Sequence, residues 1–294
     1  LVAPNVANTG VISAQQGEVI LAAGNSVQLV DTGTPGVKVE VTTTDGNKAE
    51  NLGTIIANSG KIGLVGALVR NSGRINADQV TRGADGRVFL RAKKDVTLDA
   101  SSVITANGER GGEISIQAET GTALVSGRVE TTGSAGKGGS LKALGQFVGL
   151  TAASLDASGS TGGGSVLVGG DAHGANADVQ NAWRTFVGLD VSIKANATMQ
   201  GDGGKVIVWA DDTTRYYGSI SARGGADGGN GGFVETSGKQ TLAFRGTVDT
   251  SAPNGSAGSL LLDPQDITIV NGSGGANDAY LSGNTVSFAE PDTT

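Results

Sequence analysis

A glycine-led strand motif recurs along most of the chain, and its spacing restricts the fold more than any other feature. Each copy is one or two small residues followed by an alternating apolar stretch, as in "GRVFLRAK", "GGEISIQA" and "GGKVIVWA". The first apolar residues of nine copies are Val19, Ile62, Val88, Ile114, Leu141, Val166, Val206, Val234 and Leu260. Six of the eight intervals between them are 25 to 28 residues long. A near-constant interval of this size indicates a repeat protein.

Each unit contains two further strand-like segments. One follows the first by about eight residues, as in "DVTLDA" and "FVGLTA", and the other has the form x-I-x-A, as in "SVITA". Glycine, Asn, Ser and Asp separate these short alternating segments, which predicts three strands per unit. One unit cannot bury its own apolar residues, but stacked units pair their backbones at ~4.8 Å and enclose a continuous apolar column. We therefore predict an all-β fold, a parallel β-helix (solenoid) of about 26 residues per coil.

A stack of antiparallel hairpins, such as a β-sandwich, is the alternative fold. That architecture does not require a constant period, and its core usually contains more aromatic residues than the 4% present here. The expected inward positions are Val, Ile, Leu and Ala, which suit a narrow interior. The repeat therefore favours the β-helix.

The β-helix is expected over residues 1–270, with two insertions where the interval is longer, at about 30–49 and 171–190. Insertions in solenoids project as loops, and binding residues concentrate in loops. The period stops after "LLLDPQDITIV", so 271–294 is expected to be an irregular tail, a cap or the start of the next segment. Because the chain opens directly on repeat-like sequence, we expect a fragment or a processed product.

Composition argues against several classes of function. The formal net charge is −7 without a run of Lys or Arg, so we expect no binding to nucleic acid, which needs clustered cations. No apolar stretch approaches the ~20 residues of a membrane-spanning helix, so we expect no membrane insertion. The chain has no cysteine. This excludes disulfides, thiolate catalysis and zinc–sulfur sites, and it suits export through an oxidising compartment.

Candidate ligand-contact residues gather in the second insertion and in the stretch "WADDTTRYYGS". They are Asp171, His173, Trp183, Arg184, Trp209, Asp211, Asp212, Arg215, Tyr216 and Tyr217. Carboxylates beside aromatic residues suggest, as an alternative function, a β-helix that binds or cleaves polysaccharide. Adjacent residues of an extended chain point to opposite faces, however, and equivalent turns such as "RAKKD" do not form a ladder of acids. We therefore predict no catalytic residue and no enzyme activity.

No cofactor or metal site is predicted. His173 is the one histidine, and no "GxSxG" elbow accompanies it. The stretch "GGADGGNGG" resembles a calcium-binding nonapeptide, but that motif binds as tandem copies at a period of about nine. Its glycines are instead expected to form the corner before the strand "FVETSG". Sequons at Asn196, Asn254 and Asn271 leave glycosylation open.

Three segments resemble a known family. "LVAPNVANTGVISAQQGEVILAAGNSVQL", "TTRYYGSISARGGADGGNGGFVETSGK" and "AGSLLLDPQDITI" resemble the N-terminal region of filamentous-haemagglutinin-like exoproteins. These are passengers of two-partner secretion in Gram-negative bacteria, and the resemblance covers about residues 1–270. The "NPNG"- and "NPNL"-type motifs of that family's secretion domain do not occur here. The segment is therefore expected to lie at or after the end of the secretion domain.

The resemblance implies a right-handed β-helix, export through an outer-membrane transporter, and a secreted or cell-surface location. It further implies a structural or adhesive stalk that acts in adhesion, aggregation or biofilm formation, with a glycan or protein receptor on a host or other cell surface. Separately, unpaired strand edges at an open terminal coil are templates for pairing, so end-to-end self-association is a further hypothesis.

Overall fold

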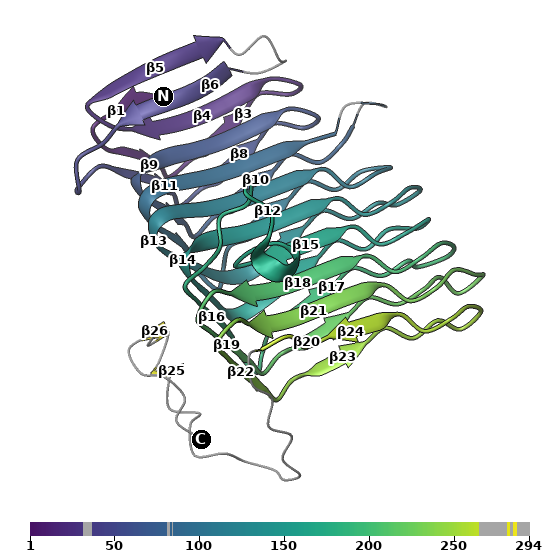
Figure 1. Ribbon diagram of the computed structural model, residues 1–294. Coiled ribbons are helices and arrows are strands. Elements are labelled where there is room, and N and C mark those ends of the chain that lie inside the picture. The colour runs from purple at the N-terminus through teal and green to yellow at the C-terminus, as the bar shows by residue number, and fades with distance from the viewer. Residues whose placement is uncertain (32–36, 81–82, 84, 265–280, 283–284, 287–294) are drawn as a thin grey trace.

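The computed structural model shows a stack of coils that forms a parallel β-helix (Figure 1). The structure describes residues 1–31, 37–80, 83, 85–264, 281–282 and 285–286. One sheet of 22 strands runs through the stack, and the strand pairs within it are parallel, as for β11 with β13 and β18 with β21. The predicted β-helix is therefore confirmed over the described residues, and the antiparallel sandwich is not formed.

The strands of each coil occupy three faces. On the first face are β1 (Val2–Ala3), β4 (Glu18–Ala23), β15 (Ser165–Val168), β18 (Lys205–Ala210), β21 (Phe233–Gly238) and β24 (Ser259–Leu261). On the second are β2 (Val6–Asn8), β7 (Lys48–Asn51), β16 (Arg184–Val187), β19 (Thr213–Tyr216) and β22 (Thr241–Phe244). On the third are β3 (Val11–Ser13), β8 (Thr54–Ile56), β10 (Arg74–Asn76), β12 (Val103–Thr105), β17 (Ser192–Lys194), β20 (Ser219–Ser221) and β23 (Thr247–Asp249).

Four strands run continuously around a corner. They are β9 (Lys61–Asn71), β11 (Arg87–Leu98), β13 (Glu113–Glu130) and β14 (Ser140–Asp156). The remaining elements lie outside the main sheet: the pair β5 (Ser26–Asp31) and β6 (Val37–Thr42), the 3-10 helix η1 (Ala172–Gly174), and the pair β25 (Leu281–Ser282) and β26 (Thr285–Val286). Apart from β25 and β26, the predicted tail 271–294 lies outside the described residues, as does Asn271.

The register of the first face follows the repeat in the sequence. Val19 pairs with Ile62, Ile62 with Val88, and the chain of partners continues through Ile114, Leu141, Val166, Val206 and Val234 to Leu260. These nine residues are the first apolar residues of the nine copies of the sequence motif. Most are fully buried, and with the inward residues of the other two faces they form one continuous apolar core.

The glycine pairs before these strands mark a close approach between coils. A Cβ at Gly164 would lie 2.1 Å from the carbonyl oxygen of Gly139, and one at Gly204 would lie 2.1 Å from that of Gly164. The same contact recurs at Gly232 against Gly204, again at 2.1 Å. No other residue fits such a column, because its side chain would overlap the backbone of the preceding coil. The stretch that ends in "GGFVETSG" is therefore a corner followed by strand β21, as predicted.

A buried polar ladder crosses the first coils. Asn8 Nδ2 donates to Asn51 Oδ1 at 2.8 Å, and Asn51 Nδ2 donates to Asn71 Oδ1 at 2.7 Å. Asn71 Nδ2 donates in turn to Ser102 Oγ at 2.5 Å. Because an unpaired amide would be costly inside the helix, each side chain needs the equivalent residue of the next coil. The ladder therefore favours one register.

Both insertions leave the stack from the end of a first-face strand. The first, expected at about 30–49, contains the antiparallel pair β5–β6, while residues 48–51 form β7, a regular coil strand paired with β9. The second, expected at about 171–190, begins after β15, and residues 184–187 form β16, which pairs with β14 and β19. Both insertions therefore begin and end a few residues earlier than expected. Each one ends where the second-face strand of its coil, β7 or β16, pairs again with neighbouring coils.

Candidate functional site

The second insertion lies over the outward side of the first face, with η1 close to β18 (Figure 1). We call residues 169–183 the strap. Beneath it, the outward residues Leu144, Leu167, Ile207 and Trp209 are apolar and buried, and Val179 of the strap packs among them. An outward face is normally polar because water covers it. Here the strap replaces that water and builds a second, smaller hydrophobic core.

Glycines of the strap fit around the indole of Trp209. A Cβ at Gly170 would lie 2.7 Å from Trp209 Cδ1, and a Cβ at Gly174 would lie 2.7 Å from Trp209 Nε1. Both glycines have positive φ, and His173 between them is also left-handed at φ 56°. The strap is therefore shaped to enclose one side chain.

An ion pair holds the first part of the strap. Lys205 Nζ donates to Asp171 Oδ1 at 2.5 Å, and Asn176 Nδ2 donates to Asp171 Oδ2 at 2.9 Å. Burial raises the pKa of Asp171, but the hydrogen bonds from Lys205, Asn176 and the Ala172 N–H outweigh it and lower the pKa to about 2. Asp171 is thus charged and fully partnered at neutral pH.

The tip of the strap is hydrogen-bonded to the buried carboxylate of Glu235. The backbone N–H of His173 donates to both oxygens of Glu235, at 3.1 and 3.2 Å, and Glu235 is fully buried. Burial raises the pKa of Glu235, and the hydrogen bond from His173 opposes that shift without cancelling it. His173 Nδ1 also lies 3.5 Å from Asp263 Oδ2, with both side chains more than half exposed. The strap therefore reaches coils that follow it in the sequence.

The second half of the strap is held by side-chain amides. Asn181 Nδ2 donates to Gly174 O at 2.9 Å and to Asp211 Oδ1 at 3.2 Å, and Trp209 Nε1 donates to the same Asp211 oxygen at 3.0 Å. Gln180 Nε2 donates to Glu119 O at 2.9 Å on an earlier coil. The strap thus connects β13 to β21 across the intervening coils.

Burial corrects the expectation that "WADDTTRYYGS" presents an aromatic contact surface. Trp209, Arg215, Tyr216 and Tyr217 are 4%, 2%, 0% and 7% exposed. Tyr216 stacks on Phe244 with ring centroids 5.2 Å apart, and its hydroxyl donates to Thr247 O at 2.9 Å. Burial also raises the pKa of Tyr216. The burial has different causes: Tyr216 on β19 points into the main core, Trp209 on β18 belongs to the smaller core under the strap, and Tyr217 packs against Phe186 with ring centroids 5.8 Å apart.

The adjacent carboxylates do not form a pair. Asp211 Oδ1 accepts the bonds from Asn181 and Trp209, whereas Asp212 Oδ2 accepts from Arg184 Nε at 2.7 Å. Both aspartates are half-buried at the corner between β18 and β19. Each one therefore binds a different neighbour, in agreement with the expectation that they do not converge.

Of the ten candidates, Trp183 presents the largest exposed apolar side chain. It is 49% exposed, and its backbone is fixed because Trp183 N donates to Gln146 O at 2.7 Å and Asp212 N donates to Trp183 O at 3.0 Å. Beside it lies an open hollow of about 360 Å³. The hollow is lined by Glu119, Thr120, Gln146, Gln180, Asn181, Trp183 and Asp211. Sequence reasoning identified two of these residues, and the others are brought there by stacking.

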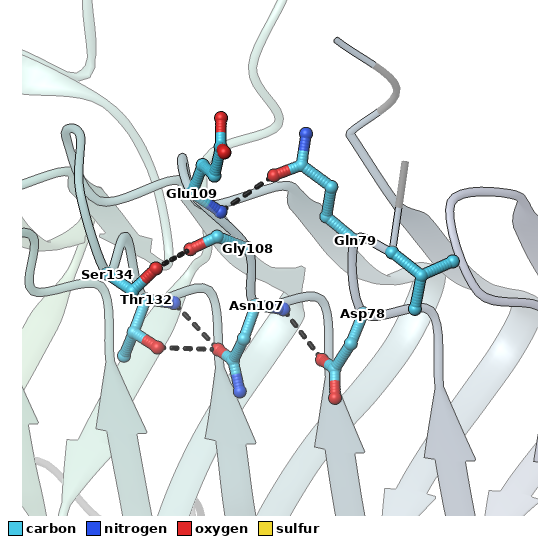
Figure 2. Close-up of a pocket in the computed structure, with 8 residues that line it drawn as sticks. Asp78, Gln79, Asn107, Gly108, Glu109, Thr132 and Ser134 are labelled. Atoms are coloured by element: carbon cyan, nitrogen blue, oxygen red, sulfur yellow. Dashed lines mark hydrogen bonds between the residues drawn. The ribbon is translucent and has the colours of Figure 1, made fainter. Parts of the chain in front are cut away.

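A second hollow, of about 380 Å³, lies where the third-face strands end (Figure 2). Asp78 Oδ1 accepts a hydrogen bond from Asn107 N at 2.7 Å, and Asn107 Oδ1 accepts one from Thr132 N at 2.7 Å. Gln79 Oε1 accepts from Glu109 N, also at 2.7 Å. These side chains bridge the backbones of successive coils, so their role is to align the coils.

Asparagine residues of two sequons are also hydrogen-bonded. Asn196 Oδ1 accepts from Ser221 Oγ and Arg223 N, each at 2.8 Å, and Asn254 Nδ2 donates to Ala226 O at 2.6 Å. Over the described residues, no group of three or more His, Asp or Glu side chains is placed to hold a metal ion. The part of the chain that the structure describes also contains no helix long and apolar enough to cross a membrane.

The fold and the sequence are similar to those of a solved bacterial structure, the HMW1 secretion domain from Haemophilus influenzae. The TM-score is 0.60 and the sequence identity is 30%. The match covers 88% of this chain and 61% of that chain. No protein-family model matches the chain, and no curated protein matches it. The chain is therefore a parallel β-helix with a likeness in fold and sequence to a secretion domain.

Proposed function

We propose that this β-helix is part of an exoprotein of the two-partner secretion type, exported through an outer-membrane transporter. The observation that carries the proposal is the likeness over 88% of the chain to the HMW1 secretion domain, at 30% identity. The three sequence segments that resemble filamentous-haemagglutinin-like exoproteins support it independently. The protein would then be secreted or held at the cell surface of a Gram-negative bacterium.

The architecture suits export of an unfolded chain. Each coil pairs its backbone with the preceding coil, so a folded coil is a template for the next one. Folding outside the cell would then proceed coil by coil and draw the chain outward without ATP. Absence of cysteine fits this route, because the chain forms no disulfide while it crosses an oxidising compartment.

At the surface we assign the β-helix the role of a stalk in adhesion, aggregation or biofilm formation. The first face stacks ten strands from β1 to β24, which at ~4.8 Å per coil corresponds to a rod about 40 Å long. Its receptor would be a glycan or protein of a host or neighbouring cell. End-to-end stacking of copies belongs to the same proposal, and concentration-dependent filaments seen by electron microscopy would support it.

A polysaccharide-cleaving β-helix is the competing function, and we propose that the chain is not an enzyme. Asp211 is hydrogen-bonded to Asn181, whereas Asp212 is hydrogen-bonded to Arg184. This supports the proposal, because glycoside hydrolysis requires two carboxyl groups that flank one bond. Incubation with a panel of plant and bacterial polysaccharides should release no reducing ends. Measurable release that Asp211→Asn abolishes would favour the enzyme instead.

Export is tested in cells that carry the gene together with a gene for a two-partner secretion transporter. The protein should appear in the medium or on the cell surface when the transporter is present and stay in the periplasm when it is deleted. A transporter variant that inserts in the membrane with a blocked pore is the matched control. Equal amounts outside the cell with and without the transporter would contradict the proposal.

A further inference from the structure

The hollow beside Trp183 has the composition of a small-molecule recognition site that none of the preceding roles uses. Its volume of about 360 Å³ falls within the ~300–1,000 Å³ of ligand pockets. It lies at the corner between the first and second faces, where Thr120, Gln146 and Trp183 come from successive coils. The coil spacing of ~4.8 Å therefore sets these side chains next to one another.

Trp183 supplies an apolar platform. Its side chain is about half exposed, although Trp209, the other tryptophan, is buried under the strap. Hydrogen bonds on both sides of its peptide, to Gln146 O and from Asp212 N, hold the backbone that carries the ring. A large ring on a fixed backbone loses little conformational entropy when a ligand packs against it.

Polar groups surround this platform, and they are of kinds that recognise hydroxyl groups. Gln146 is exposed, and its amide carries both donors and an acceptor. Asp211 Oδ1 is held by Trp209 and Asn181, which fixes the carboxylate at the rim. Gln180 is oriented by its bonds to Glu119 O and from Gln117 Nε2. Preorganised amides and carboxylates beside an aromatic face match a sugar ring, which has hydroxyls at its edge and C–H groups on its faces.

The negative charge of the residues that line the hollow favours a neutral sugar over an acidic one. The lining includes Glu119 and Asp211 and no Lys or Arg. Arg91 lies nearby and is bound to Glu119 at 2.7 Å, while Arg184 is bound to Asp212 at 2.7 Å. The protein as a whole carries a formal charge of −7. A sulfated or uronic-acid glycan would therefore be repelled, whereas a neutral sugar would not.

We propose that the corner formed by Thr120, Gln146 and Trp183 together with the strap is a binding site for a neutral hexose or N-acetylhexosamine unit of a glycan. Trp183 packs on the face of the ring, and Gln146 and Asp211 bond its hydroxyl groups. This inference rests on the proposed surface function, for which it names the receptor class. Glycan binding at this site would not depend on self-association of the chain or on enzyme activity.

Two tryptophans make the test direct, because each gives one indole N–H signal in a proton–nitrogen NMR spectrum of the ¹⁵N-labelled chain. The probes are cellotriose, N,N′,N″-triacetylchitotriose and a heparin-derived hexasaccharide. A saturable shift of the Trp183 signal with either neutral trisaccharide, and no shift with the heparin hexasaccharide, is the expected result. Trp183→Phe assigns the signals.

Variants separate recognition from folding. Trp183→Ala and Gln146→Ala should each weaken binding of the neutral trisaccharide at least about fivefold, as removal of a contact residue does. Leu189→Ala, at an apolar residue that is 76% exposed, should leave binding unchanged. Circular dichroism checks that each variant keeps its β signal, since the substituted side chains are exposed.

Three outcomes would overturn the inference: no shift with either neutral trisaccharide, equal binding by Trp183→Ala, or tighter binding of the heparin hexasaccharide at this site. The measurement uses purified chain in solution. Failure here would therefore leave the export proposal intact, and failure of transporter-dependent export would not alter the binding result.

Discussion

Single residues of this chain are constrained chiefly by the distance between coils. Glycine occupies the corner before most first-face strands, and at Gly164, Gly204 and Gly232 the carbonyl of the preceding coil lies where a Cβ would be. Other corners are set by side chains that cap the backbone of the next coil, as Asp78 and Asn107 do. The effect of a substitution on stability therefore depends mainly on the residues at the equivalent position of the adjacent coils, and less on the neighbouring residues in the sequence.

Gly232→Ala should lower the free energy of unfolding by about 1–3 kcal/mol or more, the usual cost of overpacking. The added methyl group would lie 2.1 Å from Gly204 O and 2.7 Å from Gly203 C, both backbone atoms that cannot rotate away. Gly46→Ala is the matched control, because no atom lies within 4 Å of its Cβ position. Urea unfolding of both variants measures the difference, and equal stability of the two would contradict the glycine column.

Asp171 should make the strap sensitive to acid. Its pKa is lowered to about 2 in the folded state, so its contribution is fully present above the ordinary value of 3.8 and is lost as the pH falls toward 2. Lys205 is 40% exposed, which reduces the contribution to about 1–2 kcal/mol.

Asp171→Asn tests this contribution. The variant should be less stable than the parent at pH 6, and the gap should narrow at pH 3, as measured by chemical unfolding at each pH. A gap of constant size would show that the carboxylate charge is not involved.

The conformation of the strap does not follow from the 26-residue repeat of the sequence. The strap covers an apolar strip, encloses Trp209 and is held at its tip by Glu235. Because Glu235 and Asp263 follow the strap in the sequence, the strap completes its contacts only after later coils have formed. It therefore couples the folding of coils that are not adjacent.

Trp209→Ala should release the strap and leave the stack in place. Loss of a buried Trp costs about 3–5 kcal/mol, and here that loss falls on the small outer core and spares the main one. Limited proteolysis should show new cleavage within 169–183, while Trp183→Ala, at an exposed residue, should show none. Cleavage spread over all coils would place Trp209 in the main core instead.

Glu235 should loosen the strap as the pH rises. Burial raises its pKa above the ordinary value of 4.5 and the hydrogen bond from His173 opposes this in part, so the contribution to docking is fully present below 4.5 and is lost as the pH rises through the raised pKa. The titratable groups that face it are His173 on the strap and Asp263 on the next coil.

Proteolysis of the strap should therefore be faster at pH 8 than at pH 4, which is below the ordinary pKa of 4.5, after correction for protease activity on an unfolded substrate. In Glu235→Gln this difference should be reduced. A strap cut equally fast at both pH values would argue against the assignment.

The repeat and the approximate places of its two interruptions were predictable from the sequence, and the conformation of the interrupting segments was not. The alternation of "GGEISIQA" identifies inward residues, and its spacing identifies their partners. The second insertion was predicted from the longer interval, but its docking over the first face was not, because its contacts depend on residues that are distant in the sequence. One signal was present: "KVIVWA" is apolar without alternation, which indicates a strand buried on both faces. That same run explains why Trp209 is a core residue.

At the scale of the whole molecule, the three faces form one rod in which each face keeps its register from coil to coil, with shifts confined to corners between faces. The outward columns of that rod bring together side chains that are far apart in the sequence, including those of the hollow beside Trp183. The proposed export, templated folding and surface recognition all depend on this register. A shift of one residue would turn the core residues of a coil outward.

Paired cysteines test that register most directly, because the chain has none of its own. Ser192 and Ser219 are partners on β17 and β20, whereas Ser192 and Ser221 are offset by two residues. A double variant Ser192→Cys with Ser219→Cys should form a disulfide under mild oxidation, since adjacent partners lie within the ~4.4–6.8 Å Cα range. The double variant Ser192→Cys with Ser221→Cys should stay reduced. Mass spectrometry that finds the offset pair bonded, or neither pair bonded, would contradict the stacked β-helix.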